Sequence, residues 1–466
     1  NSTMTEQLKL KLNDSKATRW GALVIVAFTM MAAYYVNDVV APLKTMLETD
    51  LAWSSTDFGF FTGGYSFLNV FFLMLIWGGL ILDRFGIRFT GKLATILMVG
   101  GTALEYYAMT GLAGADATLF GINEIFGYKT GVFVAFAGYS IFGVGAEVAG
   151  ITVSKIIAKW FKGKELATAM GVQVALARIG SQAGYAVAIP LARAFGISTP
   201  VLLGLVLLLG GMIAFFIFAV MDKKLDKQME AAAIAAGTED EEEKFSFKDV
   251  KNILVNPGFW LIALLCVLFY SCVFPFQKFA SELMIIKYGI NENVAGTFAG
   301  LPALGALILT PVFGGFIDKR GKSASIMLLG SAMLICVHFI YAIPDINYWL
   351  VAIVLMIILG IAFSLVPSAM WPAVAKIFPV SQLGTAYALI FFIQNIGLWG
   401  IPTLIGWVLD AYCISGKKPD GTNMYDYTVP MCIFTSIACL SLIVALLLKK
   451  ADKKYGYKLE EPNIQK

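Results

Sequence analysis

Glu147 and Arg178 form the most informative pair in the sequence, because each is an ionisable residue inside a long apolar run. Charged side chains are costly near the centre of a bilayer, so they usually face a polar cavity or each other. A turn at Gly163 follows Glu147 by 16 residues and precedes Arg178 by 15, which places both about 23 Å from the turn on antiparallel helices. We therefore expect the two side chains to share one depth and one cavity wall.

Two interpretations of this pair stay open. A structural ion pair would neutralise both charges inside the protein, as buried charges normally require. Alternatively, the planar guanidinium of Arg178 binds the carboxylate of a solute while Glu147 binds its ammonium group. A zwitterion could split the pair, so both could hold in turn. Gln182 and Tyr185 follow Arg178 at helical spacing and are predicted to share its substrate-binding face.

Other polar residues inside apolar runs are predicted to bind the same solute, with contacts between helices as the competing interpretation. They are Asn37, Asp38, Asn69, Tyr270, Gln277, Gln394 and Asn395. Asn37 and Asp38 equally fit a membrane boundary. Lys278 and Glu282, four residues apart after Pro275, predict either a local ion pair or part of an outer gate.

The composition indicates that these residues belong to a membrane protein. With 58% hydrophobic and 14% charged residues and a mean hydropathy of +0.77, a chain of 466 residues does not describe a water-soluble globule. Six Cys and one His are too few for a zinc cluster, a disulfide scaffold or a His-based catalytic site. No motif of an intramembrane enzyme is evident. We expect no enzyme activity, cofactor, metal or nucleic-acid partner.

The apolar runs predict an all-α integral membrane protein with twelve transmembrane helices. The runs lie near residues 20–42, 55–82, 89–112, 129–158, 164–193, 199–221, 257–287, 292–317, 323–343, 346–375, 382–411 and 427–449. A polar segment with an acidic stretch at 239–243 separates the sixth run from the seventh. The predicted parts are an N-terminal tail (1–19), a six-helix bundle (20–221), a cytoplasmic linker (222–256), a second six-helix bundle (257–449) and a C-terminal tail (450–466).

Charge predicts orientation and location. Most of the 35 Lys and Arg residues fall on one side if both termini and the linker are cytoplasmic, as the positive-inside rule requires. The short N-terminus carries no adjacent-leucine acidic sorting signal and no targeting extension. We expect a monomer in a plasma membrane, most simply a bacterial inner membrane.

A short motif occurs twice, at positions 235 residues apart, after the second and the eighth apolar runs. Its residues are Gly79, Asp83, Arg84, Gly86 and Arg88 in the first copy, and Gly314, Asp318, Lys319 and Gly321 in the second. An Asp at the C-terminal end of its own helix opposes the helix dipole, so a basic side chain or another helix N-terminus should compensate it. We predict two equivalent conformational-switch loops on one membrane face.

The repeated G-x-x-x-D-[RK]-x-G pattern in a twelve-helix chain resembles the signature loop of the major facilitator superfamily. Longer stretches are similar to its lysosomal dipeptide-uniporter branch. These stretches are Trp160 to Leu166, Ala177 to Ser181, Phe274-Pro275-Phe276, and Met370 to Gly397. The resemblance implies two six-helix bundles around a cavity, a dipeptide substrate, facilitated diffusion by alternating access, and substrate-binding roles for Glu147 and Arg178.

Two other functions remain to be compared. Tyr139 stands where many proton-coupled members of the superfamily carry an arginine, eight residues before Glu147, which leaves proton coupling open. A proton-coupled carrier of small organic anions is the first alternative; Arg178 would serve either solute, whereas only a zwitterion uses Glu147 directly. A non-transporting receptor or scaffold is the second, and the short predicted tails argue against it.

Overall fold

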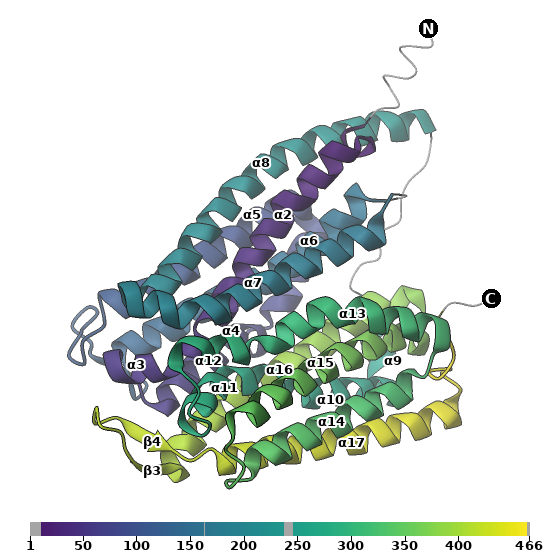
Figure 1. The fold of residues 1–466 in the computed structure, drawn as a ribbon. Coiled ribbons are helices and arrows are strands. Elements are labelled where there is room, and N and C mark those ends of the chain that lie inside the picture. The colour runs from purple at the N-terminus through teal and green to yellow at the C-terminus, as the bar shows by residue number, and fades with distance from the viewer. Residues whose placement is uncertain (1–10, 163, 237–245, 464–466) are drawn as a thin grey trace.

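The structure is a computed structural model that describes residues 11–162, 164–236 and 246–463 (Figure 1). The acidic stretch at 239–243 and the turn residue Gly163 lie outside the described residues. The first-half elements are η1 Leu12–Asp14, α2 Lys16–Val39, η2 Ala41–Leu43, α3 Lys44–Leu51, α4 Ser55–Phe71, α5 Met74–Thr110, β1 Glu124–Ile125, β2 Tyr128–Lys129, α6 Thr130–Trp160, α7 Leu166–Phe195 and α8 Thr199–Ala236. The second-half elements are α9 Phe247–Leu254, α10 Pro257–Ser271, α11 Phe274–Ile286, α12 Glu292–Ala299, α13 Leu301–Arg320, α14 Ser323–Ala342, α15 Trp349–Ile377, α16 Val380–Tyr412, β3 Ile414–Lys417, β4 Asn423–Tyr425 and α17 Thr428–Tyr455.

The described chain is an all-α membrane protein with two short antiparallel hairpins, β1–β2 and β3–β4. Nine of its described helices are long and apolar enough to cross a membrane, or ten when the bent pair α4–α5 counts as one span. The thirty-residue α7 is not among them, and it carries Arg178, Ser181 and Gln182. Twelve crossings stay a prediction.

Several predicted helices are broken where the sequence interrupts backbone hydrogen bonding. Pro275 cannot donate a backbone hydrogen bond, and the seventh predicted run divides into α10 and α11 just before it. The eighth divides into α12 and α13 at Gly300. α4 and α5 meet at a 58° bend, and α5 breaks again at Gly86, where φ is 82°. Only Gly readily adopts a positive φ, so Gly86 is what allows the chain to turn at the first copy of the repeated motif.

The sixth predicted helix continues beyond its expected end at residue 221, because α8 extends to Ala236. The added turns begin at the buried Asp222, whose carboxylate accepts hydrogen bonds from Arg88 (2.8 Å), Lys159 (2.9 Å) and Trp160 Nε1 (2.9 Å). These contacts tie the extension to α5 and α6. The predicted polar linker therefore contains helix over its first 15 residues, 222–236.

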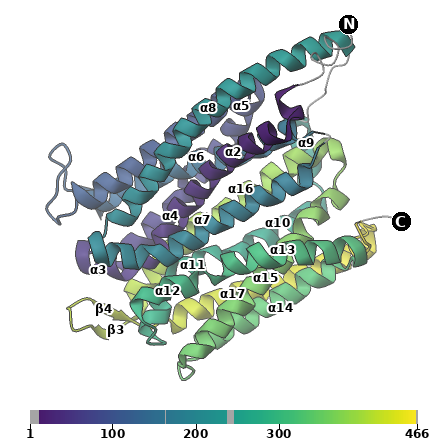
Figure 2. The ribbon, with the colours of Figure 1, turned by 45° about the horizontal axis from the view of Figure 1, so that its top comes forward.

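The helices gather into two groups, one before and one after residues 237–245 (Figures 1 and 2). In the first group, α2 packs on α7 and α8, and α5 packs on α6 and α8. In the second, α14 packs on α15 and α17, and α10 packs on α16 and α17. The groups meet chiefly through α4 with α16 and through α7 with α12 and α13. We call these groups the N-terminal and C-terminal bundles.

The two bundles approach each other at one end of the molecule and diverge toward the other (Figure 1). The hairpin end carries α3 and the β3–β4 hairpin. The linker end carries the C-terminal end of α8, α9 and the last turns of α17. Where α4 crosses α16 near the hairpin end, a Cβ on Gly59 would lie 2.4 Å from the Pro402 carbonyl oxygen, so this approach requires glycine.

Candidate functional site

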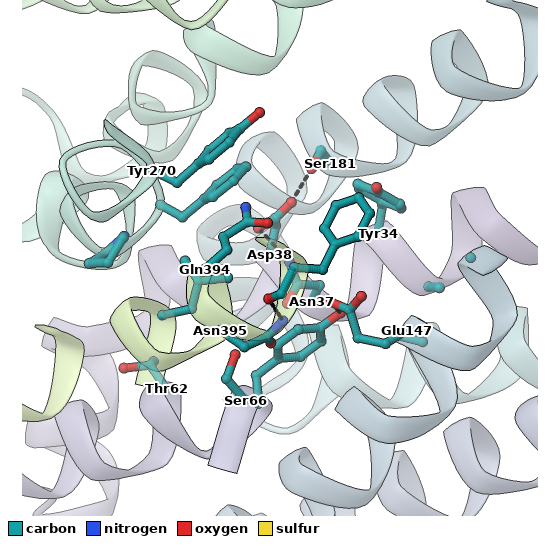
Figure 3. Close-up of a pocket in the computed structure, with 18 of the residues that line it drawn as sticks. Tyr34, Asn37, Asp38, Thr62, Ser66, Glu147, Ser181, Tyr270, Gln394 and Asn395 are labelled. Atoms are coloured by element: carbon teal, nitrogen blue, oxygen red, sulfur yellow. Dashed lines mark hydrogen bonds between the residues drawn. The ribbon is translucent and has the colours of Figure 1, made fainter. Parts of the chain in front are cut away.

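A cavity of about 670 Å³ lies between the bundles and is lined by both of them. Seven of the predicted site residues line it, namely Asn37, Asp38, Glu147, Arg178, Tyr270, Gln394 and Asn395. Figure 3 shows Glu147 and Tyr270 on opposite sides of this cavity, with Gln394 and Asn395 between them. The volume falls within the range of small-molecule sites in proteins.

Glu147 reaches the cavity from α6, at a place where small residues bring α4 close. A Cβ on Gly143 would lie 2.0 Å from the Tyr65 carbonyl oxygen, so only glycine allows this approach. The Tyr65 hydroxyl, on α4, donates a hydrogen bond of 3.1 Å to Glu147 Oε1. One neutral donor leaves most of the acceptor capacity of the carboxylate available for a ligand.

Arg178 lines the cavity from α7 and faces the C-terminal bundle. Its guanidinium carbon lies 4.8 Å from the centre of the Phe363 ring on α15, a cation–π distance. Within the described chain, Arg178 and Glu147 form no ion pair. The alternative in which the two residues neutralise each other directly is therefore absent from this conformation, and both charged groups face the cavity separately.

Lys278 lines the cavity from α11 and contacts the opposite bundle. Its ammonium group donates hydrogen bonds to the Asn37 carbonyl oxygen (2.9 Å) and the Tyr139 hydroxyl (3.1 Å), and it lies 3.9 Å from Asp38 Oδ1. Ser181 donates a hydrogen bond to the same Asp38 carboxylate (Figure 3). Sequence reasoning left Lys278 out of the site, although a lysine inside an apolar run was itself a signal.

The predicted local ion pair between Lys278 and Glu282 is wrong, because each residue binds the N-terminal bundle instead. Both Glu282 carboxylate oxygens lie 2.8 Å from Lys44 Nζ on α3, and the Lys44 and Glu282 side chains are 2% and 0% exposed. The Tyr427 hydroxyl donates a further hydrogen bond of 2.7 Å to Glu282. These cross-bundle contacts fit the other interpretation, an outer gate.

Two further polar contacts join the bundles at the hairpin end. Asp410 on α16 accepts hydrogen bonds from the backbone (2.6 Å) and side chain (2.5 Å) of Thr56 on α4. Tyr425 on β4 donates to Glu48 on α3 over 3.3 Å. We call Lys44–Glu282, Thr56–Asp410 and Glu48–Tyr425 the cross-bundle lock. They close the hairpin end of the cavity in this conformation.

Four predicted substrate-binding residues lie outside the cavity lining. Asn69 is 1% exposed and buried in α4, and Gln277 donates to the Ala299 carbonyl oxygen over 3.3 Å. Gln182 and Tyr185 pack against α12 and the residue after it, since a Cβ on Gly300 would lie within 2.8 Å of both side chains. Their helix face therefore contacts the other bundle, which the spacing from Arg178 did not reveal.

The two predicted switch loops have different surroundings. Asp83 lies 4.0 Å from Lys155 Nζ, and Arg88 binds Asp222 and Asp226 on α8. A Cβ on Gly86 would meet nothing within 4 Å. The basic side chain expected beside Asp83 is thus present. Gly79 and Arg84 complete this loop and do not line the cavity.

The second loop is covered by the segment that follows α17. Lys322 N and Ser323 N donate to the backbone carbonyls of Glu460 (3.1 Å) and Leu459 (3.0 Å). Asp318 accepts a hydrogen bond of 2.9 Å from the Asn463 side chain. A Cβ on Gly321 would lie 2.5 Å from the Glu460 carbonyl oxygen. Gly314 and Lys319 lie on the preceding helix, α13.

At the linker end, an ion pair joins α2 to Glu165, which lies in the turn between α6 and α7. Arg19 on α2 donates two hydrogen bonds, of 2.6 and 2.9 Å, to the carboxylate of Glu165, the residue before α7. Hydrogen bonding from Arg19 holds the pKa of Glu165 at about 2, below its usual 4.5. This pair lies within the N-terminal bundle.

Two bundles of membrane helices around a polar cavity are the architecture of a secondary transporter. The chain belongs to the Major Facilitator Superfamily, which matches residues 23–402, and it is therefore a secondary transporter and not an enzyme. It is 28% identical over 450 residues to the lysosomal dipeptide transporter MFSD1 of Homo sapiens, covering 94% of this chain and 87% of that protein. The protein of the same name from Danio rerio is 26% identical over 441 residues, covering 92% and 86%.

Solved structures share the fold at low sequence identity. A peptide transporter, POT, in complex with sulfate matches with a TM-score of 0.67 and 14% identity, over 94% of this chain and 96% of that chain. A D-xylose-proton symporter matches with a TM-score of 0.65 and 15% identity, over 92% and 97%. These structures share the fold, and the family match over residues 23–402 confirms the resemblance to the superfamily inferred from the repeated loop motif.

Proposed function

We propose that this transporter moves a small zwitterionic solute, in the first place a dipeptide, by alternating access. The observation that carries the proposal is the separation of Glu147 and Arg178. They line one cavity with opposite charges and are not paired with each other. A dipeptide offers an ammonium group and a carboxylate in one extended molecule, so it can bind both at once.

The balance of charges on the cavity wall favours a zwitterion over an anion. The charged lining residues are Asp38, Glu147, Arg178 and Lys278, two of each sign. Because Asp38 lies beside Lys278, the remaining pair offers one carboxylate and one guanidinium. An organic anion would use only Arg178 and leave Glu147 without a partner, which disfavours it. Relatives named as dipeptide transporters support the same choice.

The test is uptake into proteoliposomes of a zwitterionic dipeptide and of its N-acetylated form. Arg178→Lys keeps the charge but loses the planar array of donors, and Glu147→Gln keeps the size but loses the charge. Both changes should lower uptake sharply, and N-acetylation should lower it in the parent protein. Glu230→Gln, on an exposed residue of α8 at the linker end, serves as the matched control. Parental uptake by both cavity variants, or indifference to N-acetylation, would refute the assignment.

We further propose that the linker end faces the cytoplasm, because most Lys and Arg residues lie there. The conformation with the cross-bundle lock intact would then be closed to the outside. Labelling of single cysteines with a membrane-impermeant reagent tests this: Glu230→Cys should react only from the cytoplasmic side and Asp50→Cys only from the other. For location we propose a plasma membrane, which fractionation of the native cells tests.

A further inference from the structure

The C-terminal bundle contributes a continuous group of aromatic side chains to the cavity. They are Tyr270, Phe274, Trp371, Tyr387 and Phe391, from α10, α11, α15 and α16. We call this group the aromatic wall. Figure 3 shows Tyr270 on the side of the cavity away from Glu147. The charged groups that we assign to the peptide termini come from α6 and α7, so the two walls differ in chemistry.

The rings of the wall are held by contacts with each other. Tyr270 stacks on Phe274 with ring centres 5.4 Å apart and the planes parallel within 1°. Trp371 stacks on Phe391 at 5.0 Å and lies 6.0 Å from Tyr387. Such contacts add stability beyond the buried area and fix the rings in place. The wall is therefore a prearranged surface in this conformation.

Several polar atoms of the wall are already satisfied within it. Trp371 Nε1 donates to the Tyr270 hydroxyl over 3.1 Å, and the Tyr387 hydroxyl donates to the Trp371 carbonyl oxygen over 2.8 Å. The Trp371 and Tyr387 donors are therefore not available to a ligand. Apart from the Tyr270 hydroxyl, the wall offers ring surface, which favours an apolar or aromatic group over a polar one.

Charge argues against a charged ligand group at this wall. The cavity lining carries two acidic and two basic side chains, so a zwitterion leaves the balance unchanged and a third charge on the ligand disturbs it. Aromatic rings also attract cations, but Arg178 already occupies the face of Phe363, whose ring lies 5.4 Å from that of Phe274. A second cation beside this guanidinium would meet a like charge.

We propose that the aromatic wall is the subsite for a bulky neutral side chain of the transported peptide. The inference rests on the proposed dipeptide function and deepens it, since it names the substrate class. The carrier should prefer dipeptides with Phe or Leu over alanyl-alanine, and disfavour those with Lys or Glu. Filling an apolar pocket with even one methylene group is worth about tenfold or more in selectivity, so we expect at least about tenfold between alanyl-phenylalanine and alanyl-alanine.

The experiment is uptake into proteoliposomes of alanyl-alanine, alanyl-phenylalanine, alanyl-leucine, alanyl-lysine and alanyl-glutamate by the full chain. The readout is the ratio of each rate to that of alanyl-alanine in the same preparation, which cancels differences in the amount of folded protein. Trp371→Ala should reduce the phenylalanine ratio about tenfold. Phe391→Leu, a milder change that keeps an apolar side chain, should reduce it less. Trp407→Ala, an exposed tryptophan of α16, should leave it unchanged.

The outcomes separate this inference from the function on which it rests. If all five dipeptides enter at equal rates, the aromatic subsite is overturned but dipeptide transport still holds. The same conclusion follows if Trp371→Ala and Phe391→Leu both keep the rate ratios of the parent protein. A ratio for alanyl-lysine above that for alanyl-phenylalanine would overturn it in favour of a cation site. Failure of every dipeptide to enter, with N-acetylation also without effect, would overturn the proposed function and this inference together.

Discussion

Removing one partner of the Lys44–Glu282 pair should open the hairpin end of the cavity. The pair joins α3 to α11, and both side chains are almost fully buried. Lys44→Met keeps an unbranched side chain of similar length but leaves the Glu282 carboxylate with neutral neighbours, the hydroxyls of Tyr427 and Thr45. In the conformation with the hairpin end open, water would solvate that carboxylate. The change therefore destabilises one conformation more than the other.

The magnitude follows from the burial of the pair. Breaking a buried ion pair by removing one partner costs about 3–5 kcal/mol, because the remaining charge is uncompensated. Since about 1.4 kcal/mol corresponds to a factor of ten, the ratio of closed to open molecules should fall by roughly two to three and a half orders of magnitude. The double variant Lys44→Met/Glu282→Gln removes both charges of the pair and should recover part of the closed population, since the buried Glu48 carboxylate beside the pair still lacks the Lys44 charge.

The assay is a distance distribution between spin labels on the two bundles at the hairpin end. Asp50→Cys and Lys417→Cys provide exposed positions on α3 and β3, with the exposed Cys336, Cys432 and Cys439 replaced by alanine. Lys44→Met should shift the distribution to longer distances, and the double variant should shift it back. Lys129→Met is the matched control, because Lys129 bonds Ala52 within the N-terminal bundle. An unchanged distribution in Lys44→Met would refute the gating role.

Three further predictions concern stability in detergent, measured as the melting temperature. Gly59→Ala should lower it by a few degrees, because the added Cβ would meet the Pro402 carbonyl and overpacking costs about 1–3 kcal/mol, whereas Gly100→Ala, which meets nothing within 4 Å, should not. Asp222→Ala should lower the melting temperature strongly, because Asp222 accepts hydrogen bonds from Arg88, Lys159 and the Trp160 indole. Glu230→Ala, on the exposed face of α8, should not lower it. Equal effects of the two variants would contradict the role of Asp222 in anchoring α8. Glu165→Gln should lower the melting temperature at pH 7 but not at pH 2. The pKa of the Glu165 carboxyl is about 2 in the folded protein and about 4.5 in the unfolded chain, so its charge stabilises the fold above pH 4.5. This contribution is lost as the pH falls toward 2. If the difference in melting temperature between the parent protein and Glu165→Gln persists at pH 2, the charge of Glu165 is not what stabilises the contact with Arg19.

Residue type and spacing predicted the shared wall of Glu147 and Arg178, since both reach the cavity from neighbouring helices. The sequence predicted one uninterrupted run over 257–287 and not the break before Pro275, although the missing backbone donor of proline is a local cause. The turn at Gly86 also has a local cause, the freedom of glycine at positive φ. Contacts between segments that are distant in the sequence could not be predicted from residue type and spacing. Lys44 and Glu282 are 238 positions apart, and helical periodicity relates only residues a few positions from each other.

How far the cavity extends along a helix was also beyond the reach of spacing alone. Gln182 and Tyr185 share a helix face with Arg178 but lie about 6 and about 10 Å further along α7, where that face packs against α12 and Gly300 instead of lining the cavity. Similarly, α8 continues past residue 221, where the sixth apolar run ends, into the segment predicted as a cytoplasmic linker. Asp222 is charged and buried at once, which requires partners from α5 and α6 that the local sequence does not show.

The segment after α17 distinguishes the two loops that share a motif. Within the described residues, Leu459, Glu460 and Asn463 bind the second loop, whereas the first loop is bound by Lys155 on α6 and by Asp222 and Asp226 on α8, so the two copies of the motif have different neighbours. Substitutions at Gly86 and at Gly321 are therefore different experiments: the first changes backbone freedom, and the second also displaces the tail. A fusion partner joined before Leu459 would remove this cover and would have the same effect as altering the loop itself.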